Sequence, residues 1–147
     1  MVEGEKVVQS TLVALLVASG GPYFVKRERE AGGGFYDIAL EPQLSRWPEI
    51  AHAALIEMKY VKAGAPAPIA EQLAQIRADA IVQLDKYSAD PALIAEWRLN
   101  EKCKVKSVKF EGDSTLHSTF YTLHSSVALH RLVLVFHGGT CVLAEEV

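Results

Sequence analysis

The sequence predicts an α/β fold in which a β-sheet is flanked by helices. Two observations lead to this prediction. Apolar residues recur at helical spacing in two long segments, 5–19 and 69–87. Short apolar runs bounded by glycine or proline read as strands and cover residues 22–30, 35–40, 52–61 and 129–136. A helix, three strands, a helix and further strands is the order typical of a sheet with helices on its faces.

Composition supports one domain, residues 1–147, with a full hydrophobic core. The chain has 147 residues, of which 50% are hydrophobic. A formal net charge of −3 argues against a binder of nucleic acid that is basic overall, although a local patch can suffice. Taken singly, each basic candidate for such a patch is expected to be solvated surface charge. The candidates are Lys26, Arg27, Arg29, Lys102, Lys104, Lys106 and Lys109.

The sequence gives no sign of membrane insertion or secretion. The apolar run 11–18 is too short to span a bilayer, and Glu3 and Glu5 precede it in place of a positively charged segment. The two cysteines, Cys103 and Cys141, form no motif and are expected to be reduced. We therefore expect a cytoplasmic protein that does not contact a membrane.

The first helix, residues 5–19, ends at Gly20-Gly21. Its expected packing face carries Val8, Leu12, Leu15 and Leu16. Glu5 and Gln9 lie on the same helix. We expect Glu5 to be an exposed acid at the helix start, where the helix dipole favours negative charge.

The helix at 69–87 is expected to pack through Leu73, Ile76, Ala80, Ile81 and Leu84. Residues 92–128 read as an elaboration of the domain. It is expected to contain a short helix at 92–100 with Trp97, and a hairpin formed by 105–110 and 119–123. A last strand is expected at 140–143.

Single aromatic and histidine residues in other places are expected to be structural. Trp47 is expected to anchor the loop 41–51 by packing. His117, His124 and His130 lack zinc-ligand spacing and read as surface or hairpin residues.

Charged side chains interrupt two of the apolar strands. Asp37 lies in the strand 35–40, and Glu57 and Lys59 lie in the strand 52–61. Because side chains alternate faces along a strand, Glu57 and Lys59 point the same way. Burying a carboxylate with an ammonium group is costly without compensation, and a divalent cation with oxygen ligands would supply it. The alternative is a solvated sheet face with a weak ion pair.

The surrounding order of residues resembles a known family. Its residues read Arg29-Glu30-x-Gly32-x-Gly34-x-Tyr36-Asp37-Ile38, then Leu55-Ile56-Glu57-x-Lys59, then Gln83-Leu84-x-x-Tyr87. This order resembles the PD-(D/E)XK nuclease superfamily, which has the restriction-endonuclease-like fold. Within it, the chain is most similar to a bacterial and archaeal branch often found behind an AAA-ATPase-like domain. The resemblance covers most of the chain, is weakest over residues 92–128, and implies a central mixed β-sheet flanked by helices.

The resemblance implies a metal-dependent nuclease that hydrolyses phosphodiester bonds, with DNA as the expected substrate and Mg²⁺ or Mn²⁺ as the cofactor. Lys59 would orient the attacking water or stabilise developing charge, and Glu30 would position a second ion or a water. The implied catalytic residues are Asp37, Glu57, Lys59 and Glu30, the metal ligands are Asp37, Glu57 and the Met58 carbonyl, and the substrate contacts are Gln83 and Tyr87.

Structural alternatives remain for three of these residues. Glu30 can be an exposed acid beside the glycine turn. Gln83 and Tyr87 can be a polar flank and a half-buried residue at a helix end.

Two further functional readings stay open. Relatives commonly sit beside an ATPase-like domain, and no Gly-x-x-x-x-Gly-Lys-Ser/Thr run occurs here. The chain could then be a weak or inactive binding and assembly module with an ATPase-like partner, although the joint presence of Asp37, Glu57 and Lys59 argues for activity. A homodimer is a further possibility, since many relatives form dimers. In the last reading the resemblance is accidental, and Glu57 and Lys59 lie on an edge or solvent-facing strand.

Overall fold

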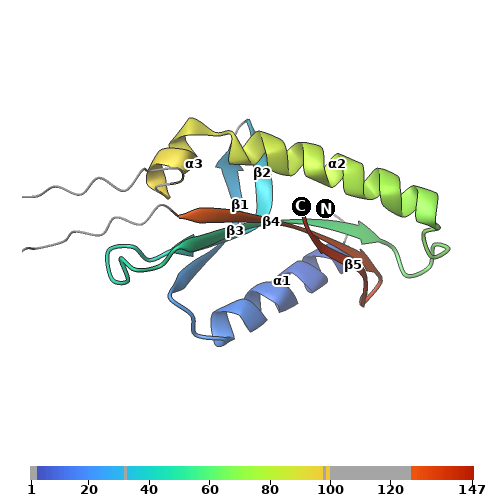
Figure 1. The fold of residues 1–147 in the computed structure, drawn as a ribbon. Coiled ribbons are helices and arrows are strands. Elements are labelled where there is room, and N and C mark those ends of the chain that lie inside the picture. Colours follow the sequence, from blue (N-terminus) through green and yellow to red (C-terminus); the bar gives the residue numbers. More distant parts are fainter. Residues whose placement is uncertain (1–2, 32, 98, 100–126) are drawn as a thin grey trace, which may run out of the picture.

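The computed structural model of the chain describes residues 3–31, 33–97, 99 and 127–147. The described residues form helices on both sides of a five-stranded sheet (Figure 1). In chain order the elements are α1 (Glu3–Ala18), β1 (Tyr23–Ala31), β2 (Gly34–Pro42), β3 (His52–Val61), α2 (Ala70–Ser88), α3 (Pro91–Glu96), β4 (Ala128–His137) and β5 (Thr140–Glu146).

The sheet is mixed, and its strands lie in the order β1-β2-β3-β4-β5. The pairs β1/β2, β2/β3 and β4/β5 are antiparallel, whereas β3 and β4 are parallel. A parallel pair requires a crossover, and α2 and α3 lie in the connection between these two strands. The predicted α/β fold with a mixed sheet flanked by helices is therefore confirmed.

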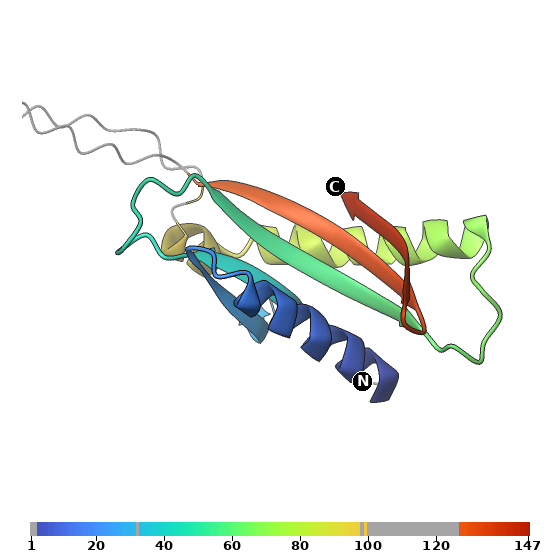
Figure 2. The same ribbon diagram turned by 90° about the horizontal axis from the view of Figure 1, so that it is seen from below.

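Each face of the sheet packs against different helices, as Figures 1 and 2 show. On one face, Leu55 and Val133 of the sheet pack with Leu84 of α2 and Leu93 of α3. The predicted packing face of α2 is confirmed: Ala80 and Leu84 are buried, and Leu73, Ile76 and Ile81 pack against the same core. On the other face, Ile38, Ile56 and Met58 pack against Val8, Leu12 and Leu16 of α1. The strand β3 thus lies between two hydrophobic layers.

Several predictions of individual positions were wrong. Leu15 is 64% exposed, whereas Val8, Leu12, Val13 and Leu16 of α1 pack against the sheet. Trp47 is 41% exposed, so it is only partly packed. The short helix ends at Glu96, with Trp97 directly after it and buried in the core. The last strand is longer than predicted and extends to Glu146.

Two described residues between α3 and β4 lie next to each other. Leu99 and Val127 form an isolated parallel β-bridge, and both side chains are buried in the core. The predicted hairpin, Cys103, His117, His124 and the lysines at 102, 104, 106 and 109 lie outside the described residues. Among the residues that the structure describes, no helix combines the length and the apolarity that crossing a bilayer requires.

The packing of α2 leads to a stability prediction. Leu84 is fully buried against the sheet, whereas Val82 on the same helix is 66% exposed. We expect Leu84→Ala to lower the free energy of unfolding by about 2–5 kcal/mol, because the substitution leaves a cavity. Val82→Ala should change it by less than about 0.5 kcal/mol. Urea denaturation of both variants tests this, and equal losses would contradict the described orientation of α2.

Candidate active site

The two candidate carboxylates lie where β2 and β3 separate. The paired register of these strands ends at Ile38 and Ile56, so Asp37 and Glu57 follow at the next opposed positions. Beyond that pair, the Asp37 side chain takes the place of a backbone carbonyl as the hydrogen-bond acceptor for β3. Oδ2 of Asp37 accepts a hydrogen bond of 2.7 Å from the backbone N–H of Met58. The Asp37 carboxylate is thereby held directly beside the Glu57-Met58-Lys59 segment.

Glu57 is a buried acid with an incomplete set of partners. It is 4% exposed, although it lies in an apolar strand. Its Oε1 accepts a hydrogen bond of 2.9 Å from Nζ of Lys59, which confirms that these side chains share a face. Its Oε2 is buried and has no hydrogen-bond partner. Burial raises the pKa of Glu57 to about 7, the negative charge of Asp37 adds to the shift, and Lys59 opposes it.

The pKa of Asp37 is also raised, chiefly because the carboxyl group is buried. The N–H of Met58 and the charge of Lys59 act against this shift. Two neighbouring carboxylates thus share one ammonium group, which does not compensate for both. Such a site favours either a bound proton or a further cation.

Asp37, Glu57 and Lys59 together form the carboxylate cluster. The helix α2 brings Gln83 and Tyr87 to it. Oε1 of Gln83 accepts a hydrogen bond from Nζ of Lys59, so the amide holds the ammonium group. The hydroxyl of Tyr87 donates to the backbone carbonyl of Phe35 at 2.7 Å, close to Asp37 in β2. The charges of Glu57 and Asp37 contribute to the raised pKa of Tyr87, after the larger effect of burial. Both residues therefore support the cluster from its α2 side.

The structure does not bring Glu30 to the two carboxylates. In the β1/β2 ladder Glu30 pairs with Phe35, close to the turn. Glu28 is the residue across from Asp37, since the flanking pairs are Arg27–Ile38 and Arg29–Tyr36. The charge of Glu28 raises the pKa of Asp37. Among the described residues Glu28 is also the one non-glycine residue with a positive φ, 49°, which is a strained conformation for glutamate.

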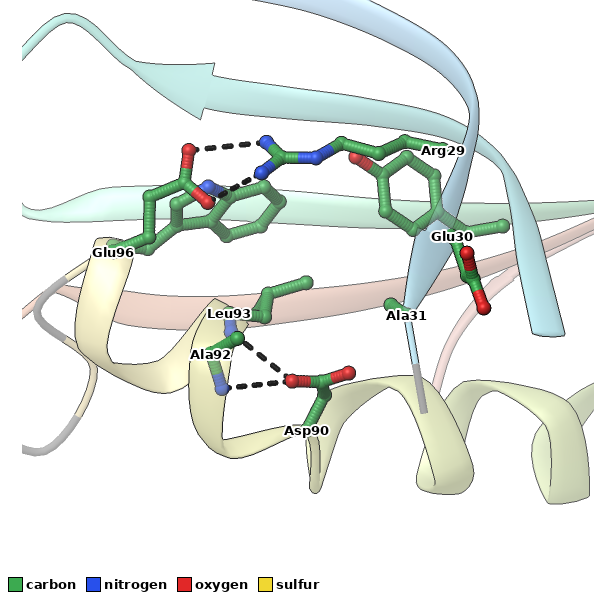
Figure 3. A pocket seen from close by; sticks show the side chains of 9 residues that line it. Arg29, Glu30, Ala31, Asp90, Ala92, Leu93 and Glu96 are labelled. Atoms are coloured by element: carbon green, nitrogen blue, oxygen red, sulfur yellow. Dashed lines mark hydrogen bonds and ion pairs between the residues drawn. The ribbon is translucent and has the colours of Figure 1, made fainter. Parts of the chain in front are cut away.

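Glu30 instead lines a pocket between β1 and α3, shown in Figure 3. The guanidinium of Arg29 spans this pocket and forms two hydrogen bonds with the Glu96 carboxylate, at 2.7 and 3.0 Å. Asp90 caps α3 below it by accepting hydrogen bonds from the N–H groups of Ala92 and Leu93. The Arg29-Glu30 segment thus joins the sheet to α3, away from the carboxylate cluster.

Two residues of α1 belong to the site, and the sequence analysis did not assign them to it. Gln9 is only 3% exposed, and its Nε2 donates to the backbone carbonyl of Asp37 at 3.2 Å. Glu5 is half-buried, and its charge raises the pKa of both Asp37 and Glu57, so it is not the exposed acid that we expected. The available signal was spacing, because Glu5 and Gln9 lie one turn apart on the face that carries Val8 and Leu12.

A comparison with family models now identifies the chain. The model described as PD-(D/E)XK nuclease superfamily matches residues 3–120. The chain belongs to the PD-(D/E)XK nuclease superfamily. Its mixed sheet flanked by helices is the restriction-endonuclease-like fold expected of this superfamily. Comparisons with curated proteins and with solved structures found no match.

Membership of the PD-(D/E)XK superfamily rules out an accidental resemblance. It also agrees with the position of Glu57 and Lys59 on the central strand β3, and not on an edge or solvent-facing strand. The superfamily supports a nuclease-like function, and its members generally use divalent metals. In the part of the chain that the structure describes, no group of three or more His, Cys, Asp or Glu side chains is arranged to hold a metal. The buried, unpartnered Oε2 of Glu57 and the carboxylate of Asp37 nevertheless fit a hard cation, which prefers oxygen ligands.

The raised pKa of Glu57 predicts how the stability of the metal-free protein depends on pH. The pKa is about 7 in the folded protein against an ordinary value of 4.5. The folded state therefore holds the proton of Glu57 more tightly than the unfolded state does. The stability that this proton contributes is lost as the pH rises from 4.5 through about 7. The amide that Glu57→Gln introduces is uncharged at every pH. Relative to the wild type it should gain about 1–3 kcal/mol of unfolding free energy between about pH 5 and about pH 8.

Urea denaturation in EDTA at a series of pH values measures this difference. Glu49→Gln, which changes an exposed loop carboxylate, is the matched control. A pH-independent difference between Glu57→Gln and the wild type would contradict the described burial of Glu57.

Proposed function

We propose that the protein is a metal-dependent nuclease that hydrolyses phosphodiester bonds of nucleic acid, with DNA as the expected substrate and Mg²⁺ or Mn²⁺ as the cofactor. One observation carries the proposal. The buried Glu57 and the half-buried Asp37, both with raised pKa values, face a single ammonium group, and one carboxylate oxygen of Glu57 has no partner. Membership of a nuclease superfamily supports the same conclusion.

The carboxylates of Asp37 and Glu57 would hold the cation, together with the backbone carbonyl of Met58. A bound divalent cation would polarise the phosphate and acidify the attacking water. Glu5 and Glu28 add negative charge around Asp37, which favours the uptake of a cation. Gln9 holds the backbone carbonyl of Asp37 from the α1 side of the sheet, so that the carboxylate keeps its position when a ligand binds.

Lys59 is the residue best placed to act on the phosphate. Its side chain is 27% exposed, so it is partly accessible from solvent. Hydrogen bonds to Glu57 and Gln83 orient it from two sides. A fixed ammonium group can stabilise the charge that develops on a phosphate during hydrolysis. Gln83 thereby acts by positioning Lys59. The sequence predicted a contact between Gln83 and the substrate, which is a separate role.

A cleavage assay tests the proposed function. Labelled single-stranded, double-stranded and branched DNA, and RNA, are incubated with the protein and Mg²⁺ or Mn²⁺, with EDTA as the metal-free control. We expect metal-dependent cleavage that Asp37→Ala and Lys59→Ala each lower by at least about 100-fold. Lys62→Ala, an exposed lysine just after β3, should cleave like the wild type.

The same assay separates the proposal from its main rival. A folded protein that binds nucleic acid or an ATPase-like partner and cuts none of these substrates would support the assembly module. Cleavage that persists in EDTA, or in both variants, would refute the assignment of the site.

The hydrogen bond between Gln83 and Lys59 gives a separate prediction. Gln83→Ala should lower kcat by about 10-fold with little change in KM, because the ammonium group loses its orientation while substrate binding is kept. Gln75→Ala, on the exposed side of the same helix, should leave both constants unchanged. A raised KM at constant kcat would instead support direct contact between Gln83 and the substrate.

A further inference from the structure

We propose that His52 and His130 form a second cation site, which takes a transition metal ion of the Zn²⁺, Ni²⁺ or Cu²⁺ class. The site lies on the other face of the sheet from the carboxylate cluster. His52 and Ala54 share the face of β3 that carries Ile56 and Met58 toward α1, whereas Glu57 shares its face with Leu55. The proposal is independent of the proposed nuclease function.

The parallel register of β3 and β4 brings the two histidines together. His52 pairs with Ala128, and Ala54 pairs with His130, so the two rings lie on a diagonal between two alanines. The small alanine side chains leave room for the rings to approach. Nδ1 of His52 lies 2.9 Å from Nε2 of His130, and the ring centroids are 5.0 Å apart with planes inclined at 44°.

Glu146 of β5 orients the second ring. Its Oε1 lies 2.5 Å from Nδ1 of His130. The carboxylate can only accept, so in the neutral imidazole of His130 it selects the tautomer with the proton on Nδ1 and the Nε2 lone pair toward His52. A carboxylate behind a histidine ring is the arrangement that fixes metal-ligating histidines and makes them more basic. Glu146 therefore prepares His130 as a ligand.

The spacing of the two nitrogens matches a pair of metal ligands. Imidazole nitrogens bind ions of this class at about 2.0–2.1 Å. Two ligands therefore lie about 3 Å apart at the right angle of a square-planar ion such as Cu²⁺, and about 3.3 Å apart at the tetrahedral angle of Zn²⁺. Without a metal, the same two nitrogens share one proton in a hydrogen bond. Both rings reach solvent, so they can turn to direct their lone pairs at one ion, and water can fill the remaining positions.

Ligand chemistry separates this site from the carboxylate cluster. Imidazole favours Zn²⁺, Cu²⁺ and Ni²⁺, whereas carboxylates suit Mg²⁺ and Mn²⁺. The two sites should therefore fill with different ions in the same solution. A bound ion would tie β3 to β4 and, through Glu146, to the end of the edge strand β5.

Electron paramagnetic resonance of bound Cu²⁺ tests the proposal in the full chain. One equivalent of Cu²⁺ is added in a large excess of Mg²⁺, which competes for carboxylate ligands but not for imidazole nitrogens. We expect splitting from two imidazole nitrogens in the wild type. His52→Ala and His130→Ala should each abolish the two-nitrogen pattern. His137→Ala should keep it, because His137 lies at the far end of β4 and contacts the carbonyl of Ala65.

Calorimetric titration with Zn²⁺ adds a second readout. Glu146→Gln keeps both rings and removes only the charge behind His130, and it should weaken binding by about 10-fold. The proposal is overturned if the His52→Ala and His130→Ala proteins keep the two-nitrogen signal and the wild-type affinity. It is equally overturned if the wild type binds neither Cu²⁺ nor Zn²⁺ in these two experiments. Cleavage assays of the same variants report on the nuclease proposal separately, since neither histidine belongs to the carboxylate cluster.

Discussion

The burial of the Glu57 carboxylate is the constraint on which the rest of the site depends. The central strand β3 is covered on both faces, so an acid there loses most of its hydration. The protein compensates with Lys59 from the same strand, and Gln83 of α2 holds that lysine in turn. The compensation is incomplete, because Asp37 adds a second negative charge and one oxygen of Glu57 stays unpartnered. The superfamily's use of divalent metals is consistent with this deficit.

Strand and helix periodicity made much of the site predictable. A period of two places Glu57 and Lys59 on one face wherever β3 lies in the sheet, and a spacing of four does the same for Gln83 and Tyr87. The order of these residues around Asp37 was enough to predict the superfamily and its fold. The individual roles of the site residues stay predictions.

Features that depend on pairing between distant segments could not be predicted. Glu28, and not Glu30, lies across from Asp37, because the register of β1 against β2 depends on how the glycine turn is built. His52 and His130 are 78 residues apart, and only the parallel register of two strands makes them neighbours. The effect of Glu5 on the carboxylates likewise requires knowing which face of α1 meets the sheet.

The bridge between Leu99 and Val127 has a consequence for how this domain can vary. Leu99 and Val127 lie side by side, and both side chains are buried in the core. The entropy cost of closing a loop grows only with the logarithm of its length, by about 0.6 kcal/mol for each doubling. Segments of very different size can therefore be exchanged between these two residues without moving β3, β4 or the carboxylates. This makes the Leu99–Val127 pair a natural point for grafting a new segment onto an unchanged sheet.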